Sequence, residues 1–172
     1  MRCAFGVGVA IFLSYASLSS RPSAPPDGGS RRALMVNLSP FTQSTVRSAI
    51  DLARRRLARS DCRLVYDDFE LPDGRSPRAE LDRLGIPPEE WLERLTFTDG
   101  SDDAVCRTGY AAFTTVPRSR LIRVCPNFSQ RYVQDSKRSA TLIIHESLHA
   151  LGLGENPPTS NEITQRVDRR CW

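Results

Sequence analysis

Residues 139–152 read Ser-Ala-Thr-Leu-Ile-Ile-His-Glu-Ser-Leu-His-Ala-Leu-Gly, one of the two clearest helical patterns in the chain. Its apolar residues recur with the period of one helix face, and several polar residues share a second face. The apolar set is Ile144, Leu148 and Leu151, and the polar set is Thr141, His145 and His149. The stretch therefore predicts a helix that packs one side on a core and carries two imidazole rings on another side.

The chain's two histidines both stand in this stretch, in the pattern His145-Glu146-x-x-His149. Because residues four apart project from the same side of a helix, both imidazoles can bind one metal ion. Zinc suits nitrogen ligands and a tetrahedral site that keeps one position for water. Zinc lowers the pKa of that water towards ~7, and a neighbouring carboxylate can then take its proton. The motif predicts a Zn2+ site with His145 and His149 as ligands and Glu146 as the catalytic base. Two histidines with only a structural role are the alternative.

A tetrahedral zinc site needs a third protein ligand, and two glutamates beyond the helix are candidates. Glu155 stands six residues after His149, and a left-handed turn at Gly152 can swing it back towards the metal. Glu162 stands thirteen residues after His149, near the start of a helix predicted for residues 160–169. Thr159 and Glu162 also fit a capping box, in which the glutamate bonds the backbone at the helix start. We expect Glu155 to be the third ligand, with Glu162 as the alternative.

The extended pattern His145-Glu-x-x-His149-x-x-Gly152-x-x-Glu155 resembles the zinc signature of the metzincin clan of metallopeptidases, H-E-x-x-H-x-x-G-x-x-H. Glu155 stands where that clan usually has His or Asp. The clan's methionine turn has no counterpart, since the chain's two methionines lie far upstream. The resemblance implies metal ligation by His145, His149 and Glu155, a general base at Glu146, and a turn at Gly152.

Two further resemblances concern the residues that follow. Asn161-Glu162 loosely resembles the second motif of the gluzincins, whose glutamate ligand lies on a later helix. Residues 151–164 (LGLGENPPTSNEIT) are similar to uncharacterised exported bacterial zincin-like proteins. Together the resemblances cover about residues 105–171 and imply an α+β, zincin-like fold. That fold has a small twisted, mostly antiparallel sheet, a backing helix and an active-site helix beneath a cleft.

The rest of the chain supplies further predicted elements. Apolar positions from Val46 to Leu57 recur at helical spacing, and that helix can start at Ser39-Pro40 or Thr42. Residues 62–66 predict a short strand, and residues 77–84 and 87–95 predict short helices. Residues 109–116 and 121–125 predict a hairpin, which we expect to pair Ala112 with Cys125. This hairpin is our candidate for a cleft edge that binds peptide by strand addition, and an interior hairpin without a substrate role is the alternative.

The N-terminal residues resemble a secretory signal. Arg2 precedes an apolar run that ends at Leu13, and small residues follow through Ser20. We expect a signal peptide at residues 1–20, a flexible Pro, Gly and Ser rich leader at 21–33, and one metallopeptidase-type domain at 34–172. The apolar run is short for a spanning helix, which is the alternative. The mature protein is then secreted or periplasmic and not attached to a membrane.

Four cysteines remain after removal of the signal: Cys62, Cys106, Cys125 and Cys171. An even number in an exported chain predicts two disulfides, and three pairings are possible. Direct pairing of Cys106 with Cys125 requires the chain around Gly109 to curl back onto the hairpin.

Composition narrows the function classes. The 172 residues are 40% hydrophobic and 26% charged with a net charge of +4, which is ordinary for one globular domain. Acidic residues are spread among the arginines, and the run at 54–56 is typical of a solvated helix face, so no nucleic-acid partner is expected. The sequence predicts a secreted zinc-dependent peptidase acting on a peptide or protein. A non-catalytic, zinc-stabilised extracellular binding domain is the alternative.

Overall fold

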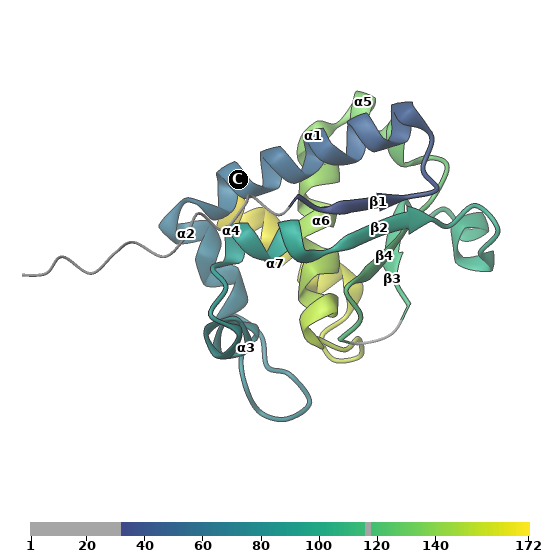
Figure 1. Cartoon of the computed structure of the whole chain (residues 1–172). Helices are drawn as coiled ribbons and strands as arrows, with labels where there is room; N and C mark the ends of the chain where they lie inside the picture. The colour runs from purple at the N-terminus through teal and green to yellow at the C-terminus, as the bar shows by residue number, and fades with distance from the viewer. Residues whose placement is uncertain (1–31, 116–117) are drawn as a thin grey trace, which may run out of the picture.

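The computed structural model describes residues 32–115 and 118–172. These residues form an α+β structure with more helix than strand and one small sheet (Figure 1). The strands are β1 (Leu34–Val36), β2 (Thr96–Asp99), β3 (Ala112–Thr114) and β4 (Leu121–Val124). The α-helices are α1 (Pro40–Leu57), α2 (Ser60–Arg63), α3 (Pro77–Leu84), α4 (Pro88–Trp91), α5 (Phe128–Gln134), α6 (Ser136–Leu151) and α7 (Ser160–Cys171). Three 3-10 turns are η1 (Leu64–Tyr66), η2 (Leu92–Arg94) and η3 (Ala104–Thr108).

The described part of the chain begins at Arg32. The signal peptide expected at residues 1–20 and residues 21–31 of the expected leader lie outside the described residues. Ala33, which the sequence assigns to the leader, is buried, and its backbone N–H donates to Glu93. Ala33 therefore packs with the residues that follow it, and the domain boundary expected at residue 34 stays a prediction.

The sheet is mixed, and the prediction of a mostly antiparallel sheet is wrong. Its strand order is β1-β2-β4-β3. β1 pairs with β2 and β2 pairs with β4 in parallel, and only β3 and β4 are antiparallel. Parallel neighbours need a long crossover between them, which helices α1 to α4 provide between β1 and β2. The sequence revealed the local hairpin but not these long-range pairings.

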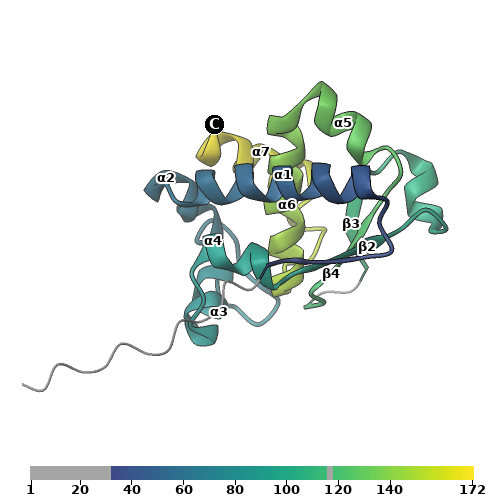
Figure 2. The ribbon, with the colours of Figure 1, turned by 45° about the horizontal axis from the view of Figure 1, so that its top comes forward.

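Helix α1 follows the predicted pattern. Ser39 caps its start by accepting a hydrogen bond from the Thr42 N–H, and Pro40 occupies the first turn, where its missing N–H costs nothing. The buried positions repeat the apolar stripe read from the sequence: Val46, Ala49, Ile50, Ala53 and Leu57. This stripe packs against α6, and Figure 2 shows α1 crossing in front of α6.

Residues 62–66 are helical, so the prediction of a strand there is wrong. Cys62, Val65 and Tyr66 are almost fully buried, whereas Leu64 is 42% exposed. Burial at i, i+3 and i+4 has the period of a helix, whereas a strand would have buried Leu64 with Cys62 and Tyr66. Helix α2 and turn η1 satisfy this pattern.

The hairpin and the disulfides are both present. β3 pairs Ala112 with Val124, so the predicted pairing of Ala112 with Cys125 is wrong by one residue. Two disulfides join Cys62 to Cys171 and Cys106 to Cys125. The second becomes possible because η3 ends at Gly109, whose left-handed φ of 95° turns the chain back towards β4.

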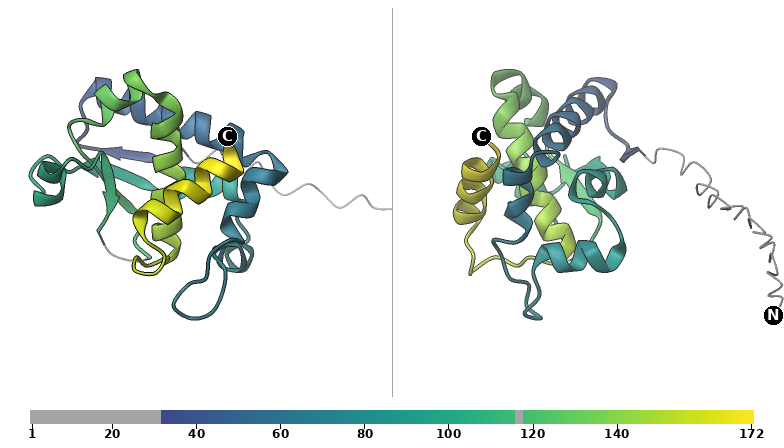
Figure 3. Two further views of the ribbon diagram at one scale, coloured as in Figure 1. Left: turned by 180° about the vertical axis from the view of Figure 1, so that it is seen from behind. Right: turned by 90° about the vertical axis from the view of Figure 1, so that its left-hand side faces the viewer.

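Helix α6 is the central element that positions the site. It packs against α1, α5, α7 and strand β3, and the view from behind shows α7 running along it (Figure 3). Two buried side chains also fasten it from other elements. Tyr66 Oη lies 2.7 Å from Ser147 Oγ, and Trp91 Nε1 donates to the Ser147 carbonyl oxygen over 3.1 Å. Among the residues described, no helix combines the length and apolar character needed to cross a membrane.

Candidate metal centre

Helix α6 contains the sequence motif and is closed at both ends by local interactions. The predicted helix of residues 139–152 extends from Ser136 to Leu151, and Asp135 caps it by accepting from the Arg138 N–H. At its other end Gly152 has φ of 113°, and the Gly152 and Leu153 N–H groups donate to the His149 and Leu148 carbonyls. This pattern is a Schellman motif, which reverses the chain after the second histidine.

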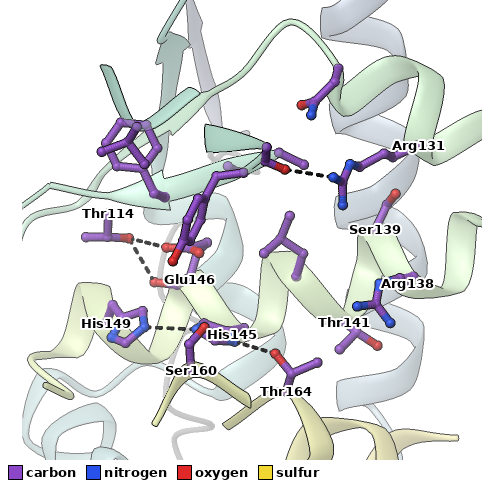
Figure 4. A pocket seen from close by; sticks show the side chains of 18 of the residues that line it. Thr114, Arg131, Arg138, Ser139, Thr141, His145, Glu146, His149, Ser160 and Thr164 are labelled. Carbon is purple, nitrogen blue, oxygen red and sulfur yellow. Dashed lines mark hydrogen bonds between the residues drawn. The ribbon is translucent and has the colours of Figure 1, made fainter. Parts of the chain in front are cut away.

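The two histidine side chains point at one another from adjacent turns. His145 Nε2 and His149 Nε2 are 2.9 Å apart (Figure 4). Two nitrogens bound tetrahedrally to one zinc ion lie about 3.3 Å apart, given Zn–N distances of about 2.0–2.1 Å. Small side-chain rotations therefore suffice for both atoms to bind one ion.

Each of the other ring nitrogens has a hydrogen-bond partner, and the partner of His149 selects its tautomer. His149 Nδ1 lies 2.7 Å from the Leu153 carbonyl oxygen, which can only accept, so Nδ1 carries the proton and Nε2 has a free lone pair. His145 Nδ1 lies 3.0 Å from Thr164 Oγ1 on α7, which can donate or accept. Both rings can therefore present Nε2 lone pairs to a cation, as metal-binding histidines commonly do.

Glu155 lies beside the histidine pair. Its Oε1 is 3.4 Å from His149 Nε2 and 3.9 Å from His145 Nε2, and the ligand atoms of the three residues lie within 4.8 Å of one another. The turn at Gly152 and the buried side chain of Leu153 bring it back, as the sequence led us to expect. The structure thus assembles a His145, His149 and Glu155 group that could hold a metal ion.

Glu162 is engaged elsewhere. Its Oε2 accepts from the Thr159 N–H over 2.7 Å, and its own N–H donates to Thr159 Oγ1, which completes the predicted capping box of α7. These bonds hold the pKa of Glu162 below its ordinary value. Among the described residues, the group that could hold a metal includes Glu155 and does not include Glu162.

Glu146 projects to the opposite side of α6 from Thr164, towards strand β3 (Figure 4). Its side chain is buried, and Thr114 Oγ1 donates to its Oε2 over 2.9 Å. Burial raises the pKa of Glu146 to about 8; the Thr114 hydrogen bonds oppose this shift and the charge of Glu155 adds to it. No arginine or lysine in the described part of the chain forms an ion pair with Glu146. A divalent cation at the histidines would favour the ionised form of this buried carboxyl, so the surroundings of Glu146 fit a metal.

The surroundings of the His145 ring also fit a metal, because they keep the ring neutral. Burial, followed by the charge of His149, lowers the pKa of His145 to about 3. A proton therefore does not compete for its lone pair at neutral pH, and metal binding requires this neutral form.

A cavity of about 900 Å³ opens over these residues. Helix α6 forms its floor, and β3, α5 and the start of α7 form its walls (Figure 4). β3 is the outer strand of the sheet on this side. Because Cys125 N donates to Ala111 O, the alternation of an antiparallel ladder turns the backbone groups of Ala112 and Thr114 away from β4. The predicted hairpin thus supplies an edge strand that borders the cavity.

Tyr110 and Tyr132 differ in their position relative to the cavity. Tyr110 lines the cavity and is 47% exposed. Tyr132 packs against the hydrophobic core and is not among the residues that line the cavity.

Two residues that contact the motif were missed by sequence reasoning, namely Thr114 and Thr164. Thr114 has no local signal, because its neighbour Glu146 is 32 residues away. Thr164 does have a local sequence signal. A polar stripe at helical spacing on α7 consists of Ser160, Thr164 and Asp168. That stripe faces the polar stripe of α6, since Thr164 contacts His145 and Asp168 accepts from Thr141.

Comparison with known proteins gives no relative to set beside this site. No family model, no curated protein and no solved structure matches the chain.

Proposed function

We propose that this protein is a zinc-dependent peptidase with a zincin-like active site, exported by the signal peptide predicted at residues 1–20. The observation that carries the proposal is the arrangement around one turn of α6. His145 and His149 face Glu155 on one side, Glu146 lies next to them, and all four line one cavity. A structural metal site has no need of a carboxylate placed beside its ligands and open to a cavity.

Each residue has a distinct task in this proposal. His145, His149 and Glu155 would hold the ion, and all three line the cavity. When bound, zinc lowers the pKa of a coordinated water and polarises a substrate carbonyl. Glu146 would serve as the general base and then the general acid: its carboxylate can accept a proton from a water in the cavity and donate it to the leaving amine. Thr114 keeps the Glu146 carboxylate in one orientation through the bond to Oε2.

The wall of the cavity supports a proposal for the substrate class. The backbone groups of Ala112 and Thr114 are directed to the open edge of β3, and an extended peptide can pair with them by strand addition. This pairing would lay the peptide along α6, with a backbone carbonyl near the histidines. A peptide or protein in extended conformation is therefore the proposed substrate.

The experiment that tests the proposal measures zinc content and cleavage of a diverse peptide library together. Wild type, Glu146→Ala, Glu146→Gln and His149→Ala are compared after zinc loading. We expect wild type to bind one zinc ion and cleave, both Glu146 variants to bind zinc without cleaving, and His149→Ala to lose both. Gln is the matched control because it can still accept the Thr114 hydrogen bond but cannot take a proton.

The alternative outcomes separate the two functions. Cleavage by Glu146→Ala at the wild-type rate would reject the proposed mechanism. Zinc binding by the wild type without cleavage of any peptide, accompanied by a loss of fold on chelation, would indicate the non-catalytic, zinc-stabilised binding domain instead.

A further inference from the structure

The cavity extends well beyond the candidate metal centre, along α6 towards its N-terminus. Arg138 lies on the same helix as His145, seven residues before it, and both line the cavity. Seven residues are two helical turns, which is about 10 Å along the axis. Figure 4 shows Arg138 and Arg131 at one end of the cavity and His149 at the other.

The charges along the cavity are unevenly distributed. The carboxylates of Glu146 and Glu155 lie at the histidine end. The guanidinium groups of Arg131, from α5, and Arg138, from α6, lie at the far end. Arg131 Nη2 donates to the Gly109 carbonyl oxygen over 2.7 Å. This bond holds the guanidinium against the chain between η3 and β3.

These two arginines form no ion pair within the described residues. The structure describes residues 32–115 and 118–172, and no ion pair formed among them includes Arg131 or Arg138. The nearby Asp135 also lines the cavity, but its Oδ1 accepts the Arg138 backbone N–H as the cap of α6. The guanidinium groups can therefore bind a carboxylate that enters the cavity, for which arginine geometry is well suited.

We propose that Arg131 and Arg138 form a carboxylate-binding subsite, so that the cavity selects peptides with a carboxylate about three residues from the bond that is cut. This inference rests on the proposed peptidase function. The spacing follows because an extended chain advances about 3.3–3.4 Å per residue, and Arg138 precedes His145 by about 10 Å along the axis of α6. The carboxylate is an acidic side chain or the C-terminus of a short peptide.

The test uses matched peptides that place Glu or its isostere Gln at each position up to three residues on either side of the cleaved bond. Each peptide is made with a free and with an amidated C-terminus. Cleavage by zinc-loaded wild type is measured as kcat/KM, and binding to zinc-loaded Glu146→Gln is measured by fluorescence anisotropy. We expect a preference of about tenfold for the carboxylate at one position. A preference confined to free C-termini identifies the terminal carboxylate, and one that follows Glu identifies the side chain.

Two substitutions assign the effect to the subsite. Arg138→Gln should reduce the ratio between Glu and Gln peptides to about one, and Arg138→Glu should favour a Lys peptide over the Glu peptide. Arg169→Gln is the control, because it removes the same charge from the exposed side of α7, outside the cavity. This variant should retain the wild-type ratio.

The outcomes separate the subsite from the peptidase function. If no peptide is cleaved but Glu146→Gln and wild type bind acidic peptides in an Arg138-dependent manner, the peptidase function fails and the subsite stands. If Glu and Gln peptides are cleaved and bound equally, or if Arg169→Gln lowers the ratio as much as Arg138→Gln does, the subsite proposal is wrong. A complete absence of peptide binding overturns it as well.

Discussion

Thr114 on strand β3 donates a hydrogen bond from its Oγ1 to Oε2 of Glu146 on helix α6, over 2.9 Å. The same hydroxyl lies 3.3 Å from the Glu146 carbonyl oxygen. One side chain of the edge strand therefore ties both the backbone and the carboxylate of the candidate catalytic base to the wall of the cavity.

Thr114→Val should lower kcat by about tenfold or more while zinc content stays at the wild-type level. Valine has nearly the same shape but leaves the buried Glu146 Oε2 without its donor, so the carboxylate loses its fixed orientation. Steady-state kinetics on a cleaved peptide, together with metal analysis, check this expectation. Thr114→Ser retains the hydroxyl and should recover most of the activity. Equal rates for the Val and Ser variants would contradict the positioning role.

Thr164→Val should weaken zinc binding by about 10- to 100-fold, because the His145 ring loses the partner that orients it. Competition with a chromophoric chelator measures the affinity. Thr164→Ser is the matched control, since it keeps an Oγ at hydrogen-bond distance from His145 Nδ1. Wild-type affinity in the Val variant would show that this contact is dispensable for the metal.

Gly152→Ala should destabilise the fold by about 1–2 kcal/mol and also weaken zinc binding. The φ of 113° disfavours any side chain, and an added Cβ would lie 2.9 Å from Arg118 Cγ. Relief of either strain moves the turn that returns Glu155 to the histidines. Chemical denaturation and zinc affinity are measured for this variant and for the control Gly154→Ala. An added Cβ at Gly154 meets no atom within 4 Å. Equal effects of the two substitutions would argue against a special turn at Gly152.

Removal of the Cys62–Cys171 disulfide should cost more stability than removal of Cys106–Cys125. The two bridges close sequence separations of 109 and 19 residues. A longer closed loop restricts the unfolded chain more, and this difference amounts to about 1.5 kcal/mol in the chain-entropy account. Denaturant unfolding of the two paired Cys→Ala variants, with and without reductant, measures it. A melting temperature that reductant leaves unchanged would contradict a stabilising role for either bridge.

The features that could be predicted from the sequence are those that depend on neighbouring residues. The apolar stripe of α1, the course of α6, the capping box of Thr159 and Glu162, and the left-handed turn at Gly152 were all predicted. Each depends on helical periodicity or on hydrogen bonds within about one turn of chain, so its physical cause lies within a few residues.

The sheet topology could not be predicted in this way. β1 and β2 have only three and four residues, and their parallel pairing joins segments separated by four helices. Residues 62–66 were predicted to form a strand, but burial of Val65 and the contact of Tyr66 with Ser147 on α6 favour a helix. Tertiary packing overrode the local pattern.

The residues of the candidate site likewise fall into those that local sequence could predict and those that it could not. The sequence indicated His145, Glu146, His149 and Glu155, because helix geometry and one turn place them together. Only the tertiary structure brought Thr114, Thr164 and Arg131 to the same cavity, from β3, α7 and α5. Spacing along one helix is set by its 3.6-residue turn, whereas contacts between elements depend on how all of the apolar faces pack together, which no short stretch of sequence encodes.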